Sequence, residues 1–509
     1  MKKQIISSLL SVLLLTMIFS CSREDLPSNN GEEPIAPPVE NTIDINHDGQ
    51  LNILILGTSK SIDNHSTVFS CQPIATELHK ILTQDTALNL DINVSFEDIY
   101  QSKVITFGLG QSAHNLDFEH YSHSLMQYYY WPENQEQRWA NLEGHLTKKW
   151  DFVIISADTY TIEKIPGYYA LGVNKIASKI AKGGAKPLLL MQWNKNATTA
   201  SFKHFEEFTY RTADGAKTQI EVVPAGLAWE SLPDAKKDEA AQFPTPNGVY
   251  LTASAIYTQM TNKSAKDSDY QYDDEIADLV LTNKENQKNK THYTGERNFM
   301  SPFKACNIED NQLNYNHTGS SSEYGILQGL KWVVLQSNRT LVNGGAYPIN
   351  FNYGRANTNF EAHKRYKIDP TKFDFSFGFP MQDNGNHGNN SMLYGLDKRY
   401  SQAENGTDLG TALYMIRNAE LPNARAIPIR TLYAQLQEAI PHHSAYSDNW
   451  HMHGNLNKAI GAYMFTMLTG ENVLPNEPAD INSNEWKAWK AHQIGYETAH
   501  TLMYLRTTP

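Results

Sequence analysis

Short apolar segments that alternate with amphipathic stretches dominate the first half of the chain. The first of them, 51–56, has the sequence LNILIL and ends at Gly57, which is typical of a strand buried on both faces of a sheet. Similar segments follow at 91–96, 151–156, 186–192 and 219–223, with helix-like stretches at 73–82 and 171–181. Strands that alternate with helices form a parallel sheet covered on both faces. We therefore predict that residues 43–265 form an α/β domain, a three-layer α/β/α sandwich with a parallel sheet.

Beyond residue 265 the sequence is rich in Asn, Tyr, Lys and Gly and has few periodic segments. We expect helices at 323–336, 410–417, 429–439 and 456–468. Two stretches resemble parts of the first half, because 459–465 resembles 249–257 and Phe373-Asp374-Phe375 resembles Trp150-Asp151-Phe152. A second related unit and one unit with a large C-terminal insertion would both leave this trace. We assign 266–440 to that insertion or second unit, and 441–509 to a C-terminal segment with terminal helices.

The chain begins with Met1-Lys2-Lys3, followed by a mostly apolar run over 5–19 and by Ser20-Cys21. A basic start, a short apolar run and a small residue are typical of a secretory signal peptide, since a membrane-spanning helix needs ~20 apolar residues. Residues 18–21, Ile-Phe-Ser-Cys, resemble the lipobox of Gram-negative lipoproteins. The resemblance implies that residues 1–20 are removed and that Cys21 is the lipidation site, whose acyl chains anchor the protein to a membrane.

The residues after Cys21 extend this expectation. Ser22-Arg23-Glu24-Asp25 resembles the acidic signal that sends some lipoproteins to the outer face of the outer membrane. The Pro-rich, polar stretch that follows cannot bury a core, so 21–42 is expected to be a lipidated tether. We therefore expect a lipid-anchored outer-membrane protein exposed at the cell surface.

Charge and cysteine content restrict the partners further. The formal net charge of −12 argues against a nucleic acid as a partner. Apart from Cys21 the chain has only Cys71 and Cys306, which could form one disulfide in an oxidising compartment.

A serine follows the first apolar segment. Gly57-Thr58-Ser59 comes directly after the predicted strand, at the edge where open α/β sheets bind ligands. Asp448-Asn449-Trp450-His451 precedes a predicted helix that ends in Leu468-Thr469-Gly470. These stretches resemble the first and last blocks of the SGNH (GDSL-like) hydrolases. The resemblance implies that Ser59 is the nucleophile, that His451 is the general base, and that Asp448 orients His451.

The same resemblance suggests an oxyanion hole. Gly110 is placed like the family's glycine donor, and the N–H of Ser59 would be a second donor. The family's asparagine donor is missing after the strand at 152–155, and Ser156 is the candidate in its place. Loss of one such donor typically costs ~2.7–4 kcal/mol of transition-state stabilisation, so this departure bears on activity.

A second departure concerns the base. Phe243 occupies the position where the histidine would fall if the family's core closed near residue 265. Either the first unit has lost its base, or Asp448 and His451 supply it from beyond the intervening segment. We favour the second interpretation.

Asp44, Asn46 and Asp48, followed by Gly49, match the first half of a calcium-binding loop. The closing acidic ligand is missing because Ile55 occupies its position. The favoured interpretation is a polar turn, with a calcium site as the weaker alternative.

Three other groups admit a function. His442, His443, His451 and His453 could bind zinc or nickel. The aromatic run 128–131 could stack on sugar rings, although four consecutive aromatic side chains cannot all face one way, and Arg355 could anchor a carboxylate or sulfate. A polar loop, core packing and ordinary turns are the plainer interpretations.

The preferred hypothesis is an envelope-anchored SGNH-like serine hydrolase without a cofactor. Its substrate would be an O-acyl, most simply O-acetyl, group on extracellular polysaccharide, as the family resemblance and the expected compartment imply. One alternative is a non-catalytic, surface glycan-binding lipoprotein, which the missing asparagine and Phe243 favour. Another is a metal-dependent enzyme centred on the histidine cluster.

Overall fold

The computed structural model describes fifteen stretches of the chain, namely 43–57, 71–99, 125–130, 135–144, 149–156, 162, 166–193, 199–237, 245–287, 306–317, 321–343, 374–378, 391–393, 424–441 and 452–504. The expected signal peptide, Cys21 and the tether lie outside these stretches. None of the helices in the described part of the chain combines the length and apolar character that crossing a membrane requires.

The first half of the chain forms a five-stranded parallel sheet with the order β2-β1-β3-β4-β5. Its strands are β1 (Gln50–Gly57), β2 (Asp91–Asp98), β3 (Phe152–Ile155), β4 (Lys186–Leu190) and β5 (Glu221–Val223). Residues 51–57 of β1 are all buried, as the continuous apolar run requires of a strand covered on both faces. The predicted α/β class and the parallel sheet are therefore confirmed.

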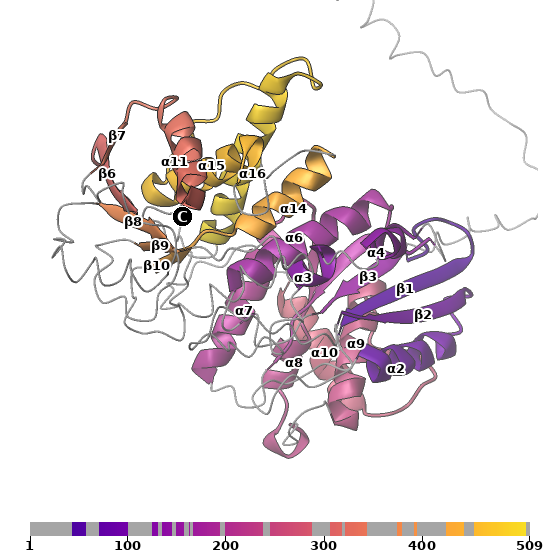
Figure 1. Cartoon of the computed structure of the whole chain (residues 1–509). Helices are drawn as coiled ribbons and strands as arrows, with labels where there is room; N and C mark the ends of the chain where they lie inside the picture. Colours follow the sequence, from indigo (N-terminus) through magenta and orange to yellow (C-terminus); the bar gives the residue numbers. More distant parts are fainter. Residues whose placement is uncertain are drawn as a thin grey trace, which may run out of the picture. The chain divides into compact units, whose positions relative to one another are not determined.

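Two groups of helices cover this sheet (Figure 1). In one group α2 and α9 pack on each other, and α10 and α8 pack on α9; in the other α3, α4 and α7 pack on α6. The helices are α2 (Cys71–Gln84), α3 (Leu125–Tyr130), α4 (Gln135–Glu143), α6 (Pro166–Lys182), α7 (Thr199–Asp214), α8 (Ala225–Glu230), α9 (Pro246–Thr261) and α10 (Asp274–Gln287). We call residues 43–287 the first repeat.

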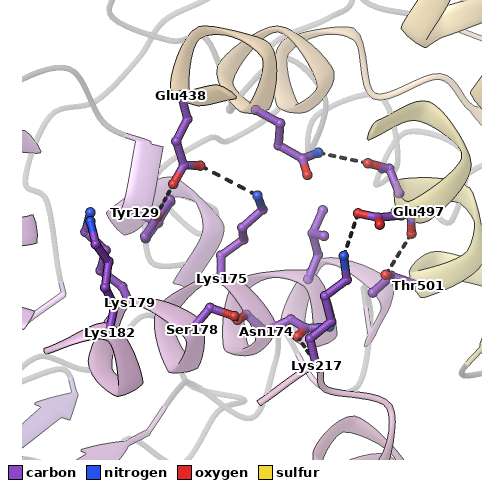
Figure 2. A pocket seen from close by; sticks show the side chains of 13 residues that line it. Tyr129, Asn174, Lys175, Ser178, Lys179, Lys182, Lys217, Glu438, Glu497 and Thr501 are labelled. Carbon is purple, nitrogen blue, oxygen red and sulfur yellow. Dashed lines mark hydrogen bonds and ion pairs between the residues drawn. The ribbon is translucent and has the colours of Figure 1, made fainter. Parts of the chain in front are cut away.

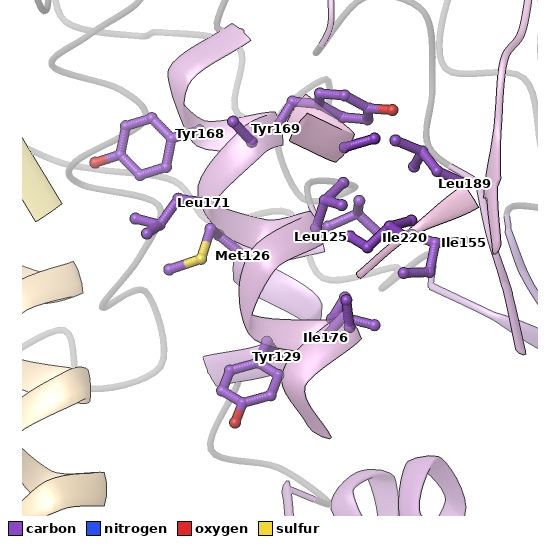
Figure 3. Close-up of a cluster of buried hydrophobic side chains, with 14 of the residues drawn as sticks. Leu125, Met126, Tyr129, Ile155, Tyr168, Tyr169, Leu171, Ile176, Leu189 and Ile220 are labelled. Atoms are coloured by element: carbon purple, nitrogen blue, oxygen red, sulfur yellow. The ribbon is translucent and has the colours of Figure 1, made fainter. Parts of the chain in front are cut away.

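The core between α6 and the sheet is formed by aliphatic and aromatic side chains from several elements (Figure 3). Leu125 of α3, Ile155 of β3 and Leu189 of β4 are among the buried side chains of this cluster. Tyr128 and Tyr129 of α3 are also buried. Their burial agrees with the plainer interpretation of the aromatic run, in which at least part of it is core.

A second five-stranded parallel sheet follows, with the order β7-β6-β8-β9-β10. Its strands are β6 (Gln312–His317), β7 (Thr340–Asn343), β8 (Phe375–Gly378), β9 (Ser391–Leu393) and β10 (Ala424–Ala426). Numbered from the first strand of each sheet, both have the order 2-1-3-4-5. The chain therefore contains a second related α/β unit, which was one of the two alternatives that the sequence left open.

In both sheets the same pair of hydrogen bonds joins the first strand to the aspartate that precedes the third strand. Asp151 donates its N–H to the carbonyl of Asn52 (2.8 Å), and its Oδ2 accepts the N–H of Asn52 (2.8 Å). Asp374 donates its N–H to the carbonyl of Asn314 (2.8 Å), and its Oδ2 accepts the N–H of Asn314 (2.7 Å). We call this arrangement the Asn–Asp clamp. It explains the resemblance between 150–152 and 373–375, and it aligns Asn52 with Asn314.

The second sheet is accompanied by four described helices, α11 (Ser321–Val334), α14 (Ile429–Ala439), α15 (Gly454–Thr469) and α16 (Asn484–Tyr504). Three of them correspond to predicted helices, whereas the helix expected at 410–417 lies outside the described residues. α15 packs on α11, α14 and α16, so the unit extends past the expected boundary at residue 440. We call residues 306–504 the second repeat.

The two cysteines in the described part of the chain do not form a disulfide with each other. Cys71 is buried at the start of α2, whereas the N–H of Cys306 donates to the carbonyl of Met467 (2.8 Å). The first repeat contains one of them and the second repeat contains the other.

Candidate active site

The carboxyl edge of the first sheet contains Ser156 and Gln192, which follow β3 and β4. The N–H of Ser156 donates to the carbonyl of Leu56 (3.0 Å), and its hydroxyl oxygen accepts from Nε2 of Gln192. Ser156 therefore lies beside the end of β1. The last residue of β1, Gly57, is two residues before Ser59 in the sequence. Ser59 and Gly110 lie outside the described residues, so the oxyanion role of all three stays a prediction.

Gln192 is a residue of this edge that the sequence analysis did not single out. It is buried, and its Oε1 has no hydrogen-bond partner in the described part of the chain. The next residue, Trp193, stacks on Trp229 with ring centroids 5.6 Å apart. The available signal was a polar side chain at the end of the apolar run of β4. Buried polar groups at such an edge are typical of a binding site.

The carboxyl edge of the second sheet has its own serine. Since the Asn–Asp clamp aligns Asn52 with Asn314, Gly57 and Ser59 align with Gly319 and Ser321. Ser321 is the first residue of α11. The second repeat therefore has the pattern Gly-x-Ser at the end of its first strand, where the serine opens the following helix.

The helix that Ser321 begins, α11, is in backbone contact with α15. A Cβ atom on Gly325 would lie 2.9 Å from the carbonyl oxygen of Met452, and one on Gly329 would overlap the carbonyl oxygen of Asn457. A Cβ atom on Gly461 would overlap Gly329 in turn. Only glycine allows such an approach. Because later residues of α11 meet later residues of α15, the helices run parallel and begin at the same end.

The helices α9 and α15, which pack on α2 and α11 in their repeats, differ in the residues that precede them. Both end at a left-handed residue, Asn262 (φ 62°) after α9 and Gly470 (φ 77°) after α15. Counted back from these residues, Phe243 corresponds to His451, and Ala240 corresponds to Asp448. The Asp-x-x-His pattern therefore belongs to the second repeat, and the first repeat lacks it. Phe243, Asp448 and His451 themselves lie outside the described residues.

The loop with the partial calcium motif is a turn held by its own backbone. Asp44 accepts the N–H groups of Asp48 (3.2 Å) and Gly49 (2.9 Å) through its two carboxylate oxygens. Asn46 also accepts from Asp48 (3.1 Å), and Asp48 accepts from Gln50 (2.9 Å). These contacts are those of the polar turn that the sequence analysis favoured.

The other metal candidate concerns the histidine cluster. His453 is the N-cap residue of α15, is exposed and makes no side-chain cap hydrogen bond. The other three histidines, His442, His443 and His451, lie outside the described residues, as does Arg355. Among the described residues no three His, Cys, Asp or Glu side chains are grouped as metal ligands would be.

A cavity of about 230 Å³ lies among α6, α14 and α16 (Figure 2). Lys175 pairs with Glu438 (3.6 Å), which also accepts from the hydroxyl of Tyr129 (2.9 Å), and Lys217 pairs with Glu497 (2.7 Å). Burial lowers the pKa of Lys175 and raises that of Tyr129. These contacts connect the two repeats, and the paired charges fit a structural role better than a catalytic one.

Comparison with known proteins gives two solved structures. No family model matches the sequence, and no curated protein matches it. A DUF4886 family protein from Bacteroides uniformis is 12% identical, with a TM-score of 0.31 over 48% of this chain and 97% of that one. A candidate SGNH hydrolase from Slackia heliotrinireducens is 16% identical, with a TM-score of 0.28 over 42% of this chain and 99% of that one. At these scores neither likeness carries an argument about activity.

Proposed function

We propose that this chain is a serine hydrolase that removes O-acyl groups, most simply O-acetyl groups, from extracellular carbohydrate. The observation that carries the proposal is the combination found in the second repeat. There a Gly-x-Ser pattern follows the first strand of a 2-1-3-4-5 parallel sheet, and an Asp-x-x-His pattern precedes the helix that packs on the helix this serine opens. A serine, an imidazole and an orienting carboxylate are the groups that ester hydrolysis needs.

The test uses the mature chain in detergent, with an alkyl fluorophosphonate as the probe and 4-nitrophenyl acetate and an acetylated xylan as substrates. We expect the wild-type chain to take the label and to release acetate. His451→Ala should lower kcat by about 10³-fold or more, as loss of a general base does. Asp448→Asn should lower it substantially, because the imidazole loses the carboxylate that fixes its tautomer.

His453→Ala is the matched control, because this exposed histidine is only two residues from His451 and makes no side-chain cap bond. A serine hydrolase should keep its activity in this variant. If the enzyme is metal-dependent and uses the histidine cluster, both variants should lose activity. The wild-type chain should then also lose activity on treatment with EDTA. A wild-type chain that takes no label and releases no acetate would instead favour the glycan-binding alternative.

We also propose that the protein is held at the outer membrane by acyl chains on Cys21. The support is the sequence of residues 1–25, with its basic start, apolar run, lipobox-like Ile-Phe-Ser-Cys and acidic residues. In cells, the wild-type chain should incorporate labelled palmitate and partition into Triton X-114, whereas Cys21→Ala should do neither. Digestion of intact cells with a protease tests the outward orientation, because a surface-exposed chain is degraded and a periplasmic one is not.

A further inference from the structure

We propose that the nucleophile of this chain is Ser321, in the second repeat, and that Ser59 is its non-catalytic counterpart in the first repeat. The assignment rests on the proposed function, since it names the serine of that hydrolase. Three observations support it: the register of the two sheets, the contact between α11 and α15, and the location of the Asp-x-x-His pattern.

The register comes from backbone contacts. Asn52 and Asn314 make the same pair of hydrogen bonds with Asp151 and Asp374. The serine seven residues beyond Asn52 is Ser59, and the serine seven residues beyond Asn314 is Ser321. A one-residue slip would move every side chain of a strand to the other face, so the shared clamp distinguishes Ser321 from its neighbours Ser320 and Ser322.

The helix contact brings the start of α11 close to the start of α15. Residue 321 lies one helical turn before Gly325, about 6 Å along the helix axis and on the same face. A Cβ atom on Gly325 would lie 2.9 Å from the carbonyl oxygen of Met452. His451 is bonded to Met452, and consecutive Cα atoms are about 3.8 Å apart. Met452, the residue that follows His451 in the sequence, therefore meets α11 within one turn of Ser321.

The same arrangement speaks against Ser59 as the partner of His451. In the first repeat the helix that follows β1 is α2, and it packs on α9, the helix preceded by Phe243. In the second repeat α11 packs on α15, the helix preceded by His451. In each repeat the helix after the first strand thus packs on a later helix of the same repeat, α9 or α15, which assigns the base to the serine of the second repeat.

The chemistry follows from this pairing. The Ser321 oxygen attacks the ester carbonyl carbon while its proton passes to His451, and the tetrahedral oxyanion forms. The C–O bond to the sugar then breaks, and the proton on His451 passes to the leaving sugar oxygen. Water attacks the acyl-serine in the same way and releases the carboxylic acid. The N-terminus of α11 presents backbone N–H groups and the positive end of the helix dipole to the oxyanion.

The experiment locates the fluorophosphonate adduct in the wild-type full chain by proteolysis and mass spectrometry, and it compares Ser321→Ala with the matched variant Ser59→Ala. We expect the adduct on Ser321. Ser321→Ala should lose the label and lower kcat by about 10³-fold or more, whereas Ser59→Ala should keep both within about twofold. Because the adduct is mapped on the wild-type chain, the assignment does not depend on the folding of a variant.

An adduct on Ser59, Ser320 or Ser322 overturns the assignment and leaves the proposed function intact. A wild-type chain that neither labels nor hydrolyses an ester overturns the proposed function and the assignment with it. If Ser59→Ala loses the label and Ser321→Ala keeps it, Ser59 is the nucleophile, which also overturns the assignment.

Discussion

The two repeats have the same sheet order but differ in how their helices pack and in the residues at the positions of the proposed site. In the first repeat β1 is a buried apolar strand, and α2 and α9, which pack on each other, carry buried side chains such as Leu78 and Leu251. In the second, β6 has the sequence QLNYNH, and α11 and α15 meet through glycines. The residues aligned with Asp448 and His451 are alanine and phenylalanine in the first repeat. The two repeats thus share a strand order, whereas the proposed catalytic residues belong to the second repeat alone.

The largest expected effect on stability comes from the Asn–Asp clamp. The Asp151 carboxylate accepts the N–H groups of Asn52, Ile45 and Asn46, whereas Asp374 accepts the N–H and side-chain amide of Asn314. Since a buried donor left unpaired costs about 1–3 kcal/mol, Asp151→Ala should lower the free energy of unfolding by about 4 kcal/mol, and Asp374→Ala by at least about 2. Hydrogen-exchange mass spectrometry would show each loss in the repeat that carries the substitution, and a loss spread equally over both repeats would contradict the comparison.

The glycine contact should be almost as sensitive. A Cβ atom on Gly329 would overlap the backbone of Asn457, so Gly329→Ala must push α11 and α15 apart, at about 3 kcal/mol. The control is Gly184→Ala in the first repeat, which has open space and φ 90° and should cost only about 1 kcal/mol of backbone strain. Thermal unfolding measures both. A Gly329→Ala variant as stable as this control would rule out the close packing.

Acid should destabilise the second repeat selectively. His492 of α16 is buried against Trp332 of α11, and burial lowers the pKa of His492 to about 4. Because the unfolded pKa is about 6.5, this stabilisation is present above pH 6.5 and is lost as pH falls through 6.5 toward 4, by roughly 2 kcal/mol at pH 5. Urea unfolding at pH 7 and pH 5 should show this loss in the wild-type chain but not in His492→Phe. His79→Gln, on the exposed face of α2, should leave it unchanged.

The smallest expected effect concerns the contact between the repeats. Lys217 pairs with Glu497 at 2.7 Å, and the Lys217 side chain is 65% exposed. Solvent screens such a pair, so Lys217→Ala should cost about 0.5 kcal/mol. Lys80→Ala removes a pair within α2 and serves as the control. Protection of α6 and α16 against hydrogen exchange should fall only in Lys217→Ala, and an equal fall in both variants would deny this pair a part in joining the repeats.

The first sheet could be predicted because several of its strands are mostly apolar runs, such as 51–56 and 152–155. The second sheet was only suggested, because its strands are short or contain Asn and His, and β9 and β10 have three residues each. For such strands tertiary packing outweighs the local pattern. A mostly apolar run was therefore a sufficient signal of a strand. The five strands of the second sheet lack such a run and were not predicted.

The candidate site divides in the same way. The spacing of Asp448 and His451 was visible in the sequence, but Gly319-Ser320-Ser321 was not seen to follow a strand, because QLNYNH has no apolar run. The available signal was a repeated triplet, Gln50-Leu51-Asn52 and Gln312-Leu313-Asn314. In each copy the asparagine lies seven residues before a serine. Only the clamp contacts showed that these triplets are equivalent.

The contact of α6 with α16, together with the ion pairs beside it, has a consequence for how the protein tolerates cleavage. Each repeat has its own sheet, and α6 and α16 belong to different repeats. Two polypeptides, one ending after α10 and one beginning before β6, should therefore associate when they are co-expressed. Such a split protein would be a heterodimer of two halves that share one strand order.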